Sequence, residues 1–97
     1  MAKIAYMFAG QGAQYPGMGS DLYESSPAAR AVFDMGEKIR PGTLEQCFSG
    51  TTEALNETVN AQPCLFHTDL AAALALDEAT GRRADVCAGF SLGEIAA

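Results

Sequence analysis

Basic residues are scarce in this sequence, tryptophan is absent and no apolar run is long. Six Lys and Arg stand against twelve Asp and Glu, which gives a formal net charge of -6. Nucleic acids and anionic membranes bind through clustered basic side chains, so we expect neither as a partner. The longest plainly apolar run, Leu70 to Leu76, has seven residues. A membrane span needs about 20, so none is expected.

Cysteine is also scarce, and its use indicates a reducing compartment. Cys47, Cys64 and Cys87 are odd in number, widely spaced and without a C-x-x-C pair. This pattern favours reduced, mostly buried thiols in a cytoplasmic protein and argues against a zinc site. The amino end has no long apolar region or cleavage site typical of a signal peptide. Asn56-Glu57-Thr58 is formally a glycosylation acceptor, which has no consequence in the cytoplasm.

The 97 residues are enough for at most one small domain, which begins with a strand and a glycine-rich loop. The apolar run from Lys3 to Phe8 predicts a first strand covered on both faces of a sheet. Four glycines and a proline follow in Gly10 to Gly19. This loop matches neither a dinucleotide fingerprint nor a P-loop. It either brings backbone amides and the Gln11 side chain to a reacting group or is a connection without chemical consequence.

Short helices are predicted in the middle of the chain. Ser26-Pro27 is typical of an N-cap and a first helical position, and an amphipathic pattern continues from Ala28 to Ile39. Thr43 has capping-box spacing to Gln46, which predicts a short helix to Phe48. Another short helical piece is expected over residues 51–59.

The longest helix is expected from about Pro63 to Thr80, where Gly81 would end it. Apolar residues surround most of this helix, so it should be buried against a sheet. His67, the sole histidine, lies in its first turns. A histidine in such a position is more often a satisfied helix residue than a catalytic base.

The stretch Gly89-Phe90-Ser91-Leu92-Gly93 fits Gly-x-Ser-x-Gly, the pattern of a nucleophile elbow. A strand-like run, Asp85 to Ala88, precedes it, and residues 92–97 can open a helix. Ser91 and Glu94 also have capping-box spacing, so Ser91 could instead be a helix N-cap. The order of elements predicts an α/β crossover unit with two parallel strands joined by helices.

Four stretches together resemble the N-terminal part of malonyl-CoA:acyl carrier protein transacylases and the acyltransferase domains of fatty acid and polyketide synthases. They are Met7 to Gln14, Pro16 to Gly19, Gln62-Pro63 and Gly89 to Glu94. Their order and separations also fit that family. The resemblance implies that residues 1–97 are a partial acyltransferase domain. The expected fold is the N-terminal fragment of an α/β-hydrolase-like parallel-sheet core, with the ferredoxin-like subdomain missing.

The resemblance implies acyl transfer in fatty acid biosynthesis through a serine ester, without a cofactor. Ser91 looks like the nucleophile that takes malonyl from malonyl-CoA and passes it to the thiol of acyl carrier protein. Gln11 matches the oxyanion-hole glutamine of the family, which works with the backbone amide of Leu92. The residues expected to bind the substrate are Gln62, Gly10, Gly12 and Phe90.

Two departures from the family limit what this piece can do alone. Phe90 stands where the family usually has histidine. The general-base histidine and the arginine that binds the malonyl carboxylate lie downstream of residue 97 in the family, and His67 matches neither. The isolated piece is therefore expected to be inactive. Two alternatives stay open: a serine esterase of the α/β-hydrolase type, and a non-catalytic fragment that self-associates through open sheet edges.

Overall fold

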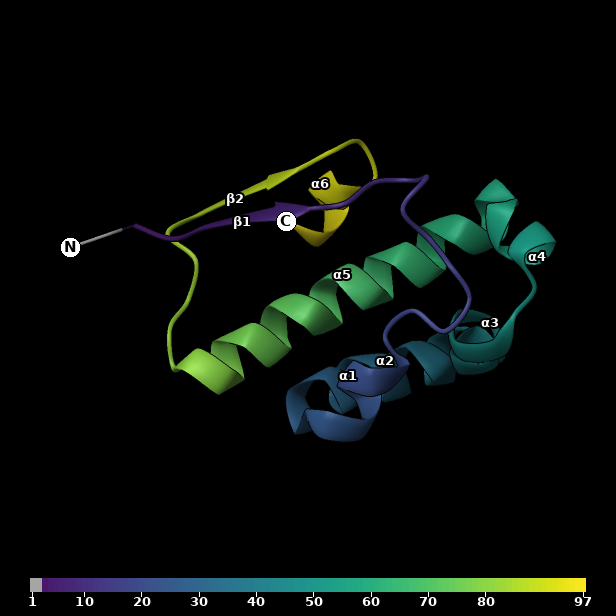
Figure 1. The fold of residues 1–97 in the computed structure, drawn as a ribbon, viewed down its shortest axis with the longest axis horizontal. Coiled ribbons are helices and arrows are strands. Elements are labelled where there is room, and N and C mark those ends of the chain that lie inside the picture. Colours follow the sequence, from purple (N-terminus) through teal and green to yellow (C-terminus); the bar gives the residue numbers. More distant parts are fainter. Residues whose placement is uncertain (1–2) are drawn as a thin grey trace.

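The computed structural model describes residues 3–97 as a two-stranded sheet, a long helix and a layer of shorter helices (Figure 1). The strands β1 (Ala5–Phe8) and β2 (Val86–Gly89) pair in parallel. The helices are α1 (Ser20–Ser25), α2 (Pro27–Ile39), α3 (Thr43–Ser49), α4 (Thr52–Asn56), α5 (Thr58–Thr80) and α6 (Gly93–Ala96). In Figure 1, α5 runs between the sheet and the layer that contains α1, α2 and α3. The predicted α/β order and parallel pairing are confirmed, whereas α1 was not predicted.

Hydrogen bonds between Ile4 and Asp85 fix the point from which β1 and β2 pair, and the sheet is covered on one face only. The Ile4 amide donates to Asp85 Oδ2 at 2.6 Å, and the Asp85 amide donates to the Ile4 carbonyl at 2.7 Å. From there the register runs from Ala5 opposite Val86 to Phe8 opposite Gly89. Phe8 is buried, but Met7 is 87% exposed. The expectation that both faces of β1 are covered is wrong, because no described element packs on the face that carries Met7.

The two ends of the helical region are set by local signals. Ser26 Oγ accepts a hydrogen bond from the Ala29 amide at 3.2 Å, and Pro27 is the first residue of α2, as predicted. Gly81 ends α5 in the left-handed conformation at φ 68°, also as predicted.

The predicted start of α5 is wrong: the helix begins at Thr58, and Pro63 lies inside it. A proline at this position removes the hydrogen bond to the Val59 carbonyl and crowds that carbonyl with its ring. Ala61, Cys64 and Leu65, on either side of the proline, are buried against the other helices. Their burial offsets the lost bond, so the helix continues through the proline.

The start of α3 is capped from another helix rather than by the predicted capping box. Its N-cap is Gly42, and the Glu37 carboxylate of α2 accepts hydrogen bonds from the amides of Gly42 (2.8 Å) and Leu44 (3.0 Å). These bonds lower the pKa of Glu37, the Gly42 amide most strongly. Thr43, the expected cap, is buried and donates its hydroxyl to the Arg40 carbonyl instead.

The core lies between α5 and the short helices. Phe33 is fully buried, and its ring packs edge-on against Phe48 at a centroid distance of 5.2 Å. His67 contacts Gly36 where α2 crosses α5, and its Nδ1 lies 2.6 Å from the Pro63 carbonyl oxygen. His67 is therefore a packed, hydrogen-bonded helix residue, as expected. Within residues 3–97, no helix is long and apolar enough to cross a membrane.

The cysteines do not all share the predicted burial. Cys47 and Cys64 are free thiols buried between α3 and α5. Cys87 is a free thiol too, but it is exposed on β2. The prediction of buried thiols is wrong for Cys87, because no described element covers β2 at this residue.

Candidate active site

Ser91 occupies a sharp turn between β2 and α6. Its φ of 54° makes it the sole non-glycine residue in residues 3–97 with a left-handed backbone. Such a conformation costs an L-residue about 1–2 kcal/mol and is common at functional sites. The turn is held by hydrogen bonds from the Phe90 amide to the Phe8 carbonyl (3.1 Å) and from the Gly93 amide to the Phe90 carbonyl (3.0 Å). Ser91 itself is exposed at the carboxyl end of the sheet.

The alternative that Ser91 caps the last helix is wrong. The N-cap of α6 is Leu92, and no side chain makes a capping hydrogen bond there. In the described part of the chain, the Ser91 hydroxyl makes no hydrogen bond. The Leu92 side chain is buried in the core and anchors the turn from below. Ser91 is thus presented to solvent on a strained, anchored turn, as a nucleophile requires.

Glycines allow three pieces of backbone to meet beneath this turn. A Cβ atom on Gly93 would overlap the Phe8 carbonyl oxygen, and one on Gly10 would overlap the Phe90 carbonyl oxygen. Any larger residue would push the end of β1, the glycine-rich loop and the serine turn apart. The structure therefore brings the start of the loop against the turn that carries Ser91.

Gln11, the loop residue expected in the oxyanion hole, has its side chain against α5. Gln11 Nε2 donates a hydrogen bond to Thr58 Oγ1 at 3.0 Å. The described hydrogen bonds include none from the Gln11 side chain to Ser91. Neither the backbone amide of Gln11 nor that of Leu92 donates a hydrogen bond to another described residue. Two unpaired amides therefore lie on the two segments that meet at the serine turn.

The remaining predicted substrate residues lie on the serine turn, the glycine-rich loop and α5. Phe90 is 75% exposed and, with Met7 and Ala88, lines a depression of about 230 Å³ on the open face of the sheet. Gly12 is exposed with φ 114°, and its amide donates to Gln14 Oε1 at 2.7 Å. Gln62 is exposed on α5, four residues after Thr58 and thus on the same helix face.

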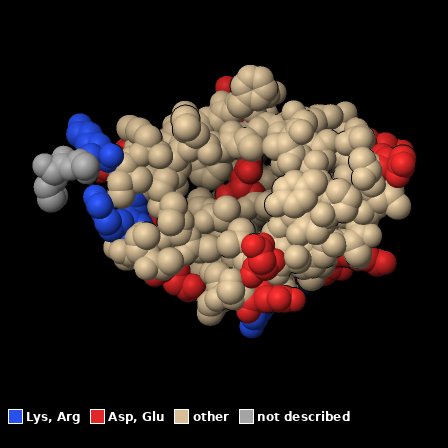
Figure 2. All heavy atoms as spheres, in the orientation of Figure 1, with Lys and Arg blue, Asp and Glu red and all other residues tan. Residues whose placement is uncertain are grey.

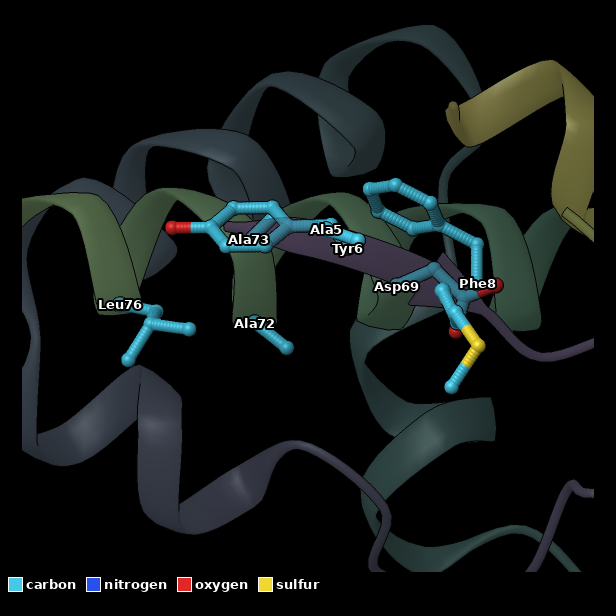
Figure 3. Close-up of a pocket in the computed structure, with 8 residues that line it drawn as sticks. Ala5, Tyr6, Phe8, Asp69, Ala72, Ala73 and Leu76 are labelled. Carbon is cyan, nitrogen blue, oxygen red and sulfur yellow. The ribbon is translucent and has the colours of Figure 1, made fainter. Parts of the chain in front are cut away.

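A larger hollow, which the sequence analysis missed, lies between β1 and α5. Figure 2 shows the face hollowed near its middle, with acidic atoms inside the hollow. Figure 3 shows Asp69 with apolar side chains that include Phe8 and Leu76. These residues line a cavity of about 280 Å³. Burial raises the pKa of Asp69 to about 6, and its Oδ2 has no hydrogen-bond partner in residues 3–97. The available sequence signal was an aspartate directly before the apolar run Leu70 to Leu76 of the long helix.

A serine on a left-handed turn at the end of a parallel strand, beside a glycine-rich loop, has the backbone geometry of a nucleophile elbow in a protein of the α/β class. Comparison with known proteins gives the family. Residues 5–97 match the acyl transferase domain family, and the chain belongs to it.

Curated relatives agree with this assignment. The malonyl CoA-acyl carrier protein transacylase of Bacillus subtilis is 44% identical over 98 residues, covering 100% of this chain and 31% of the relative. The probable mitochondrial malonyl-CoA-acyl carrier protein transacylase of Drosophila melanogaster is 41% identical over a match that covers 94% of this chain and 25% of that protein. The chain thus spans about a third or less of the length of these relatives.

Solved structures show the same fold. The malonyl CoA-acyl carrier protein transacylase of Clostridium perfringens superposes with a TM-score of 0.87 at 33% identity, over 98% of this chain and 30% of that one. An acyltransferase domain of the salinomycin polyketide synthase gives 0.90 at 38% identity, over 100% of this chain and 23% of that one. The family resemblance expected from the four sequence stretches is confirmed.

Proposed function

We propose that this chain supplies the serine-bearing part of a malonyl-CoA:acyl carrier protein transacylase. The observation that carries the proposal is Ser91, exposed on a left-handed turn with the unpaired Leu92 amide beside it. The relatives named above are malonyl transacylases, and one similar structure is a type II polyketide synthase acyl-carrier protein in complex with its malonyl-transacylase. We infer the same two partners for this chain: malonyl-CoA and acyl carrier protein.

The proposed reaction has two half-steps. Ser91 Oγ attacks the thioester carbonyl of malonyl-CoA, and the C–S bond breaks as the serine proton is transferred to the departing coenzyme A sulfur. The thiol of acyl carrier protein then attacks the carbonyl of the serine ester, the bond between that carbon and Ser91 Oγ breaks, and the thiol proton is transferred to Ser91 Oγ. Each step passes through a tetrahedral oxyanion, which backbone amides stabilise; losing one such donor typically costs about 100- to 1,000-fold in rate.

The oxyanion donors that fit this geometry are the backbone amides of Leu92 and Gln11. The Gln11 side chain is hydrogen-bonded to Thr58, whereas the Gln11 backbone amide is unpaired. Gln11 thus keeps the oxyanion role that the resemblance implied, but through its main chain. Gly10 and Gly12 give the loop its close approach, and Phe90 and Gln62 flank the substrate.

A general base and a group to bind the malonyl carboxylate are needed as well. His67 does not fit the first role, because its ring is packed against Gly36 and bonded to Pro63. The resemblance places a histidine base and a carboxylate-binding arginine in sequence that follows this region in the family. We therefore propose that residues 1–97 are a partial acyltransferase domain of a cytoplasmic enzyme, with an α/β-hydrolase-like core completed by further strands and a ferredoxin-like subdomain.

The open face of the sheet supports self-association of the isolated chain. Four large apolar side chains on the strands, the serine turn and α6 are well exposed: Met7 (87%), Val86 (58%), Phe90 (75%) and Ile95 (70%). Within residues 3–97, neither edge of the two-stranded sheet has a further strand as partner, which favours pairing with another chain. Light scattering should show oligomers, and a clean monomer would contradict this expectation.

The experiment that tests the proposed function is intact-mass analysis after incubation with malonyl-CoA. A malonyl group found on Ser91 of the parent and missing from Ser91→Ala would identify Ser91 as the nucleophile, whereas an adduct that persists in Ser91→Ala would contradict this role. Ser25→Ala is a matched control, because Ser25 is also exposed but donates its hydroxyl to the Asp21 carbonyl, away from the site. Transfer of the label to added acyl carrier protein supports the transacylase, whereas hydrolysis of the adduct to free malonate would favour the esterase alternative. Absence of an adduct on every variant would overturn the activity for this chain alone.

A further inference from the structure

The junction between α4 and α5 holds the middle of the glycine-rich loop. Gln11 Nε2 donates to Thr58 Oγ1 at 3.0 Å, and Gln14 Nε2 donates to Asn56 Oδ1 at 3.2 Å. Gln14 Oε1 in turn accepts the Gly12 amide at 2.7 Å. We propose that Thr58 and Asn56 are positioning residues, which set the loop so that the Gln11 backbone amide can serve as an oxyanion donor. This inference rests on the function proposed above.

The loop needs such a support because little else fixes its middle. Its start is packed against Phe90 through Gly10, and its end is fixed by the Gly17 amide, which donates to the Cys47 carbonyl at 2.9 Å. Between these points residues 11–13 are exposed. An exposed glycine-containing segment with few hydrogen bonds is mobile unless side chains hold it. The bonds from Gln11 to Thr58 and from Gln14 to Asn56 hold this part of the loop from 47 and 42 residues away in the sequence.

The side chains at the junction are not occupied with capping the helix that follows. Threonine at a helix start ordinarily accepts a hydrogen bond from a helix amide. Thr58 is the first residue of α5, and the N-cap, Glu57, makes no side-chain capping bond. Thr58 Oγ1 instead accepts from the loop. Because Gln62 lies one turn along the same face, the first two turns of α5 fix both glutamines of the proposed site.

A threonine-to-valine exchange removes the acceptor while keeping the shape of the side chain. In Thr58→Val, the Gly12 backbone amide, which is hydrogen-bonded to Gln14, should exchange with solvent roughly 2- to 10-fold faster, the range expected for one lost hydrogen bond. Thr58→Ser, which keeps the hydroxyl, should restore the parent rate. Thr52→Val is the matched control, because Thr52 is the exposed first residue of α4 and makes no described bond to the loop. Asn56→Ala removes the bond between Gln14 and Asn56 and should make the Gly12 amide exchange faster.

Exchange is measured on ¹⁵N-labelled protein by NMR, without substrate, and circular dichroism verifies that each variant is folded. Unchanged exchange in Thr58→Val, or equal loosening in Thr58→Ser and Thr52→Val, would overturn the inference. In the malonyl-CoA assay, Thr58→Val should lower the acylation rate at saturation and leave the half-saturating concentration unchanged. If the parent gains no malonyl group, the proposed function fails for this chain, and the exchange rates still decide whether Thr58 positions the loop.

Discussion

Replacing Asp69 by asparagine should stabilise the protein at neutral pH and leave its stability near pH 4 almost unchanged. Asp69 Oδ2 is buried in the hollow between β1 and α5 and has no hydrogen-bond partner among the described residues (Figure 3). Burial raises the pKa of this carboxyl from its ordinary value of 3.8 to about 6. The folded protein therefore holds the proton more tightly than the unfolded chain does. Stability is lost as the pH rises from about 4 to about 6, and the loss is constant above that window.

The size of the effect follows from the difference between the two pKa values. A difference of about 2 corresponds to roughly 3 kcal/mol for a fully shielded group. The rest of the Asp69 side chain is partly exposed, so solvent screening reduces the expected penalty to about 1–2 kcal/mol at pH 7. Asparagine resembles the protonated carboxyl in shape and is never charged, so Asp69→Asn should recover this free energy.

Urea unfolding at pH 7.5 and near pH 4 measures the effect directly. The midpoint of Asp69→Asn should exceed that of the parent at the higher pH and match it at the lower one. Glu24→Gln makes the same carboxyl-to-amide exchange on the exposed surface of α1 and is the control. Equal midpoints at pH 7.5, or a gain of the same size at both pH values, would refute the argument from burial.

Two further predictions concern the thiols and the serine turn. Iodoacetamide should modify Cys87 alone in the folded protein, because Cys47 and Cys64 are buried, and it should modify all three thiols in urea. Mass spectrometry of the intact protein counts the adducts. Fast labelling of Cys64 under native conditions would be inconsistent with the described core. Gly93→Ala should lower the free energy of unfolding by roughly 1–3 kcal/mol, because its methyl group would overlap the Phe8 carbonyl oxygen. Denaturation midpoints test this, and a variant as stable as the parent would mean that β1 and the turn are less closely packed.

Local chemistry made several features predictable from the sequence. Ser26-Pro27 starts a helix and Gly81 ends one because capping depends on the backbone next to the residue itself. The glycines around Ser91 likewise indicated a strained turn, and Ser91 has the left-handed backbone.

The features that were not predicted depend on residues distant in the sequence. Glu37 caps α3 from a neighbouring helix, so the capping box at Thr43 was misleading. Pro63 indicated a helix start, but burial on both sides of it carries α5 through the proline. The Gln11 side chain has its partner 47 residues away, on α5, which no local spacing reveals.

The pairing of β1 with β2 sets the order in which parts of the chain can fold during synthesis. Each residue of β1 pairs with a residue 81 positions later, as Ala5 does with Val86. Contacts between α2 and α5 join residues much closer in sequence, so the helical layer can assemble while the chain is still growing. On the ribosome β1 must wait as an unpaired strand until β2 has emerged. The serine turn, whose amide bonds back to the Phe8 carbonyl, is consequently among the last parts of this region to form.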